Sequence, residues 1–140
     1  MRTEVGGVSE RVPYLYSIIR LVPNLERGEA LNIGLILFCR PHRFLRVGYV
    51  IDTSRIACFA PEVDLQLVES RLGSLHLIAE ADKRGGPVAE LDIGERFHWL
   101  SNVSNTMIQP GDVHSGLTLD AEETFTRLFT DLVAASPLEP

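Results

Sequence analysis

Three polar residues have side chains that could act together on a substrate: Glu29, Asn32 and His114. Glu29 stands at the mouth of the apolar segment that begins at Ala30, Asn32 lies three residues further on, and His114 belongs to a later segment, VHSGLTLD. A carboxylate and an amide can bind and polarise a substrate, and an imidazole can serve as general base. If the fold brings these side chains into one pocket, the chemistry is that of a small hydrolase or nuclease-like enzyme.

A structural role accounts for Glu29 and Asn32 equally well. The two residues can tie down the loop that precedes the apolar segment, with the Asn32 amide hydrogen-bonded to loop backbone. Arg20, on the preceding predicted strand, can form an ion pair with Glu29. In that arrangement neither residue would be catalytic.

His114 also has two interpretations. Its segment contains Gly116 and is expected to form a loop just before a helix, where free backbone amides can bind an anion. Alternatively, His114, Thr118 and Asp120 orient this loop and cap the helix.

Other reaction types lack a signature in the sequence. The nucleophile elbow GxSxG, the P-loop and the dinucleotide motif GxGxxG are all missing. The four histidines do not have the spacing of metal ligands, and Cys39 and Cys58 lie within or beside apolar runs, which is typical of reduced core residues. We therefore expect neither a metal nor another cofactor.

Composition indicates a single folded domain. The chain has 140 residues, of which 45% are hydrophobic and 23% charged. Its net charge of -6 argues against nucleic acid as a partner, because binding to phosphates needs a basic surface. The sequence contains neither a membrane-length apolar run nor an apolar signal core near its start, so we expect a cytoplasmic protein without membrane contact. Residues 1–12 are predicted to be a flexible tail and 13–136 one globular domain.

Three arginines form a local basic cluster in this acidic chain. Arg40, Arg43 and Arg46 surround a predicted hairpin turn. Guanidinium groups make planar contacts with carboxylates and phosphates, so the cluster is a candidate docking surface for an acidic partner. An ordinary solvated turn is the alternative.

Strands are predicted in the first half of the chain. Apolar and polar residues alternate over 14–22 and again over 45–51, while 30–39 is almost continuously apolar. Continuous apolar character is typical of a central strand that is buried on both faces. A further short strand is expected over 106–109.

Helices are predicted later in the chain. Apolar residues recur at helical spacing over 65–79, and Asp120 precedes a second amphipathic helix with a stripe that runs to Ala135. A shorter amphipathic piece, 93–100, is expected to form one or two helical turns. Strands first and helices later favour an α+β fold: a small, mostly antiparallel sheet with two main helices packed on one face.

Several segments in this order resemble the bacterial family catalogued as domain of unknown function 3037. They are YSIIRLVPNLERGEALNIGLILF, RFHWL, the Gln109 segment, VHSGLTLD and LFTDLV. The resemblance runs from about Tyr14 to Val133. Besides Glu29, Asn32 and His114, its motif residues, for which we expect structural roles, are Arg20, Arg27, Gly28, Gly34, Trp99, Gln109, Gly116, Thr118 and Asp120.

The resemblance implies a context rather than an activity. Members of the family tend to be encoded beside HipA-type Ser/Thr kinases, the toxin half of bacterial toxin-antitoxin modules. Together with the missing catalytic signatures, this favours a non-enzymatic accessory or regulatory protein that binds a partner such as a HipA-type kinase. The alternative is the small enzyme with a pocket around Glu29, Asn32 and His114, and a homo-oligomer is left open.

Overall fold

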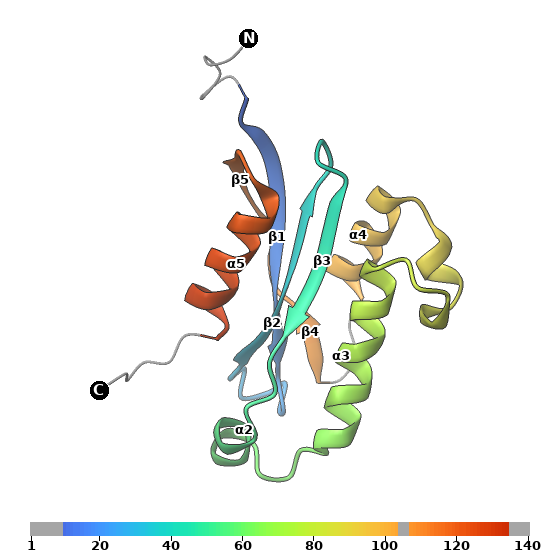
Figure 1. The fold of residues 1–140 in the computed structure, drawn as a ribbon. Helices are drawn as coiled ribbons and strands as arrows, with labels where there is room; N and C mark the ends of the chain where they lie inside the picture. Colours follow the sequence, from blue (N-terminus) through green and yellow to red (C-terminus); the bar gives the residue numbers. More distant parts are fainter. Residues whose placement is uncertain (1–9, 104–106, 135–140) are drawn as a thin grey trace.

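The structure, a computed structural model, describes residues 10–103 and 107–134. Within these ranges an antiparallel sheet carries helices on both faces (Figure 1). The strands are β1 (Val12–Leu21), β2 (Leu31–Cys39), β3 (Phe44–Tyr49), β4 (Ile108–Pro110) and β5 (His114–Thr118). The helices are α2 (Thr53–Phe59), α3 (Leu65–Ala79), α4 (Ile93–Asn102) and α5 (Ala121–Leu132), with short 3-10 turns η1 (Lys83–Gly85) and η2 (Pro87–Glu90). The predicted α+β class with a mostly antiparallel sheet is confirmed.

Strand β2 is the centre of this sheet. It pairs with β1 on one side and with β3 on the other, and every residue from Ile33 to Cys39 is buried. A strand without an exposed face must be apolar almost throughout, as the sequence of 31–39 is. The prediction of a central strand buried on both faces is therefore confirmed.

The two faces of β2 pack into two separate cores. Ile36 and Phe38 belong to a cluster with residues of α3 and α4, whereas Leu35 and Leu37 pack with residues of α5 such as Phe125. Figure 1 shows the same arrangement, with α5 on one side of the sheet and α3 and α4 on the other. The expectation that both main helices lie on one face was wrong in this respect. A strand that is apolar on both faces needs a helix layer on each, because a single layer would leave half of its side chains in water.

On the side away from β2, β1 pairs with an edge that is interrupted between two short strands. Strand β5 pairs with the first half of β1, up to Tyr16 opposite His114, and β4 pairs with the end of β1, from Ile19 opposite Pro110. Residues 111–113 therefore face only two residues of β1, and the chain bulges. The Gly111 N–H donates to the Ile18 carbonyl at 2.8 Å, which holds the start of this bulge against β1.

Aspartates begin the helices. The carboxylates of Asp52, Asp64, Asp92 and Asp120 accept hydrogen bonds from backbone N–H groups in the first turns of α2, α3, α4 and α5. These bonds satisfy donors that have no partner inside the helix. The predicted cap at Asp120 is confirmed, with bonds from the N–H groups of Glu122 and Glu123. No helix among the described residues combines the length and the hydrophobicity that crossing a membrane requires.

Some local expectations differ from the structure. The VHSGLTLD segment forms strand β5, not a loop, and helix α2 was not predicted at all. Cys39 is buried as expected, but Cys58 is exposed on α2. Most of the predicted tail lies outside the described residues, and strand β1 already begins at Val12.

Gly34 is a position in β2 where a side chain would not fit. A Cβ atom there would lie 2.9 Å from the Gly48 carbonyl oxygen and 3.0 Å from a methyl carbon of Ile19. The first of these atoms is backbone, so β3 would have to move to relieve the contact. The glycine thus sets the close approach of three strands at the centre of the sheet.

We predict that Gly34→Ala lowers the free energy of unfolding by about 1 to 3 kcal/mol, because the added methyl overpacks the sheet. Gly73→Ala is the matched control: its Cβ would meet only the Tyr49 hydroxyl at 3.9 Å, within helix α3. Alanine there should raise stability by about 0.5 to 1 kcal/mol through helix propensity. Urea denaturation measures both changes, and equal stability of Gly34→Ala and wild type would contradict the packing account.

Candidate functional site

The bulge between β4 and β5 opens a cavity of about 240 Å³ at the edge of the sheet. It is lined by Ile18, Arg20, Gly111, Asp112 and His114. Ile18 also packs with the α5 cluster, so this cavity opens on the sheet face that α5 covers further along. Arg20 and His114 were identifiable from the sequence as motif residues, whereas Gly111 and Asp112 were not. Pro110-Gly111 between two short β-like segments is the signal that could have indicated this break.

Arg20 is placed in the cavity by the alternation of β1. It follows Tyr16 and Ile18 at intervals of two residues, so the three side chains share one face of the strand. Its Nε atom is buried and has no hydrogen-bond partner. The expected ion pair with Glu29 is absent, since Arg27 occupies that carboxylate with bonds of 3.0 and 3.1 Å. Arg27 is closer in sequence and lies on the same loop as Glu29.

His114 is the first residue of β5, directly opposite Tyr16. The two rings lie with centroids 5.2 Å apart and planes tilted by 33°. This contact orients an imidazole that is otherwise exposed. His114 therefore belongs to a strand, not to the loop before α5 where we expected it.

Side chains at the start of α5 already accept hydrogen bonds from its free backbone amides. Asp120 accepts from two backbone N–H groups, and the Thr118 hydroxyl accepts from the Asp120 N–H at 3.0 Å. That hydroxyl also lies 2.6 Å from the hydroxyl of Thr124. Thr118 and Asp120 thus have the structural role that we considered for them, and His114 takes no part in it. Because the carboxylate of Asp120 fills the amide site, an anion would not be bound there.

Glu29 lies on the loop between β1 and β2, beside a second cavity of about 530 Å³. Hydrogen bonds from the Arg27 guanidinium, assisted by its charge, lower the pKa of the Glu29 carboxyl below the ordinary value of 4.5. A general base is most effective when its pKa is near the working pH. Held ionised by Arg27 and exposed, Glu29 does not have the environment of a general base at neutral pH.

Asn32 connects β2 to the end of α5. A bulge in β2 shifts the register, with Arg20 opposite Asn32 and Ile19 opposite Gly34, so that Asn32 comes to the α5 face. Its side-chain N–H donates to the carbonyl of Leu132 at 3.1 Å. That carbonyl lies in the last turn of α5, where backbone acceptors have no partner within the helix. We expected this amide to bond to the loop backbone before β2, and that expectation was wrong.

The three candidate catalytic residues are thus not gathered in one pocket. Leu31 pairs with Leu21 and His114 pairs with Tyr16, positions that are about 16 Å apart along β1 at roughly 3.3 Å per residue. Glu29 precedes Leu31 and lines a different cavity from His114. In the described residues, no three His, Cys, Asp or Glu side chains are placed to share a metal ion.

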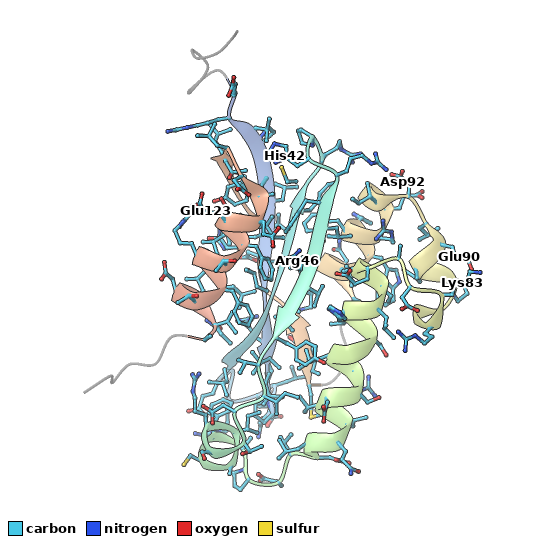
Figure 2. All side chains as sticks on the ribbon, viewed as in Figure 1. His42, Arg46, Lys83, Glu90, Asp92 and Glu123 are labelled. Atoms are coloured by element: carbon cyan, nitrogen blue, oxygen red, sulfur yellow. The ribbon has the colours of Figure 1, made fainter. Side chains whose placement is uncertain are left out.

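The three arginines of the hairpin also separate. The Arg40 guanidinium lies 5.1 Å from the centre of the Phe38 ring, on the α4 face. Arg46, labelled on β3 in Figure 2, lies over Phe44 and forms an ion pair of 3.6 Å with Glu122 of α5. Arg43 is exposed at the turn, with a φ of 50°. Arg40 and Arg46 therefore point to opposite faces of the sheet.

The remaining motif residues shape the backbone and the packing. Gly28 has a φ of 72° in the loop whose turn is held by the Asn24 side chain. Gly116 lies under the Tyr14 ring, which leaves no room for a Cβ. Trp99 of α4 packs against the larger core, and Gln109 of β4 pairs with Arg20 in the sheet.

A family comparison covers most of this chain. The model of a family described as "Protein of unknown function (DUF3037)" matches residues 16–133. This chain belongs to that family. The DUF3037 match runs from within β1 to the end of α5 and so includes both cavities described above. No curated protein and no solved structure matches the chain.

We predict that Asn32→Leu lowers the free energy of unfolding of this DUF3037 protein by about 1 to 3 kcal/mol, because the Leu132 carbonyl loses its partner. Asn102→Leu is the matched control, since the Asn102 amide is exposed and bonds only within α4. Its effect should stay within about 0.5 kcal/mol. Chemical denaturation measures the free energy of unfolding of both variants. Similar decreases for the two would show that the bond from Asn32 to α5 is unimportant.

We also predict that the Glu29 carboxyl titrates below pH 4.5 in NMR, and that Arg27→Gln moves its midpoint upward, while Arg127→Gln does not. Because folding lowers this pKa, the contribution of the pair to stability is present above about pH 4.5 and is lost as the pH falls through the folded-state pKa. A midpoint near neutrality would instead give Glu29 the properties of a general base.

Proposed function

We propose that this DUF3037 protein is a non-enzymatic accessory protein that works by binding another protein. The observation that carries the proposal is an apolar surface on the edge strand β5. Val113, Leu117 and Leu119 have exposed fractions of 45%, 62% and 55%. Leu117 lies on β5 on the face opposite to His114, and Val113 and Leu119 directly precede and follow the strand. We call these three residues the β5 surface.

The backbone of β5 adds to this surface. Among the described residues β5 pairs only with β1, so its outer side faces no other strand. An edge strand offers N–H and C=O groups that can pair with a strand of another chain. Apolar side chains beside such an edge lose contact with water when a partner covers them, which favours association.

The partner that we propose is a HipA-type Ser/Thr kinase. This choice rests on the resemblance to a family that tends to be encoded beside such kinases, and the β5 surface supplies a place for the contact. An enzymatic role has less support, because Glu29, Asn32 and His114 do not line one cavity.

The arginine hairpin is a second candidate contact. Arg40 and Arg46 already contact aromatic rings, and Arg46 also pairs with Glu122, so Arg43 is the member most available to a partner. Charged rim contacts of this kind mainly increase the rate of association. We therefore regard Arg43 as an auxiliary contact and the β5 surface as the main one.

The test is binding of purified HipA-type kinase from the same host to folded variants. We predict that Leu117→Asp leaves the melting temperature near that of wild type and weakens binding about tenfold or more, as expected for a buried interface anchor. Leu25→Asp is the matched control, because Leu25 is equally exposed, at 61%, on the loop after β1. Arg43→Glu should mainly slow association.

Four results would contradict the proposal or part of it. If the wild-type protein does not bind the kinase, the proposed partner is wrong. If Leu117→Asp binds the kinase like wild type, the β5 surface is not the contact. Analytical ultracentrifugation provides a further check: a wild-type dimer that Leu117→Asp converts to monomer would mean that the β5 surface binds a second copy of the chain. Loss of function in a folded His114→Ala variant that still binds the kinase would contradict a role limited to kinase binding.

A further inference from the structure

The half-buried side chain of Arg20 has a buried nitrogen that lacks a hydrogen-bond partner. Its Nε is buried without a hydrogen bond, and no ion pair or hydrogen bond in residues 10–103 and 107–134 engages its side chain. Arg96, by contrast, is buried and donates to the carbonyls of Leu91, Ile78 and Ala79. Arg20 as a whole is half-buried, and a buried donor without an acceptor is unfavourable, so a ligand that supplies an acceptor to Nε would be stabilising.

A second donor lines the same cavity. His114 reaches it from β5, its ring is oriented by Tyr16, and it makes no hydrogen bond with the described residues. Two nitrogen-bearing side chains from neighbouring strands therefore line one opening, and neither makes a hydrogen bond or ion pair with the described residues. An oxyanion can accept from both at once, and a guanidinium suits such a ligand because of its planar set of donors.

The remaining lining residues define what would fit. Asp112 contributes a carboxylate, and it pairs with neither Arg20 nor His114. It would repel a second negative charge but accept a hydrogen bond from a hydroxyl group. The volume of about 240 Å³ is below the roughly 300 to 1,000 Å³ of pockets for drug-sized molecules. The cavity therefore suits a small anion or the charged end of a larger ligand.

Gly111 keeps the space beside the guanidinium open. A Cβ atom built at this position would lie 3.6 Å from the Arg20 Nε and 3.4 Å from the Ile18 carbonyl oxygen. Both are ordinary contact distances, so alanine is compatible with the fold. Its methyl would nevertheless take up room next to Arg20, inside the cavity.

We propose that the gap between β4 and β5 is a binding site for a small oxyanion group, a phosphate or a carboxylate, held by Arg20 and His114 in the space that Gly111 leaves free. Leu117, the residue of the β5 surface that lies within the strand, is on the opposite face from His114 and does not line this cavity. It does not depend on the proposed kinase partner.

Isothermal titration with sodium phosphate, sulfate and acetate at constant ionic strength tests the site. We expect saturable binding of at least one of these anions to wild-type protein, and the ranking of tetrahedral against planar anions then identifies the ligand group. Arg20→Gln should weaken binding about tenfold or more, because it removes charge-assisted hydrogen bonds. Arg127→Gln, with the same change of charge on an exposed part of α5, should bind like wild type.

Gly111→Ala tests the proposal even if Arg20→Gln does not fold. It retains every charged group, so weaker anion binding with an unchanged melting temperature supports the site. The absence of saturable binding to wild type would overturn the proposal, and so would equal weakening by Arg20→Gln and Arg127→Gln, which indicates only nonspecific charge. Leu117→Asp should bind the anion like wild type, so that failure of the partner proposal and failure of this one are distinguishable.

Discussion

Burial of strand β2 on both faces is the constraint on which the rest of the structure depends. Its residues from Ile33 to Cys39 leave no side for water, so α5 must cover one face and α3 with α4 the other. The close contacts at Gly34 then bring the three central strands together. Asn32, the polar residue of this strand, is satisfied only because α5 ends above it.

The position of α5 also explains where the polar residues of β1 lie. The helix packs over β2 and β3, and the part of its cluster on β1 runs through Tyr14, Tyr16 and Ile18. Further along the same face the strand continues with Arg20, beyond this apolar cluster. The break between β4 and β5 exposes this region to the edge of the sheet. The cavity is therefore the place where the helix layer and the edge strand both leave β1 uncovered.

Sequence patterns predicted the elements that depend on local periodicity and hydrophobicity. The three long strands and the helices α3 and α5 could be located, and so could the cap at Asp120. The side of the sheet on which each helix packs could not be predicted, because it depends on tertiary contacts. Strand β5 was missed since its short, glycine-containing sequence gives little β signal, and its pairing depends on β1, about 100 residues away.

The candidate site shows the same limit. The alternation of β1 was enough to place Tyr16 and Arg20 on one face, and His114 was recognised as a functional candidate. Their meeting in one cavity depends on the register of β5 against β1, which no local pattern contains. Glu29 and Asn32 looked like partners because they are close in sequence. A bulge in β2 and the nearer Arg27 give them different partners.

The pairing of β1 with β4 and β5 has a consequence for the order of folding. Ser17 and Gly111, joined by a hydrogen bond of 2.9 Å, are 94 residues apart in the sequence. During synthesis, the hairpin of β1 and β2 can form early, but the outer side of β1 stays unpaired until residues 108–118 have left the ribosome. Contacts over such long separations form slowly, because much chain entropy must be lost before they form. The nascent protein thus carries an open strand edge until β4 and β5 have been synthesised.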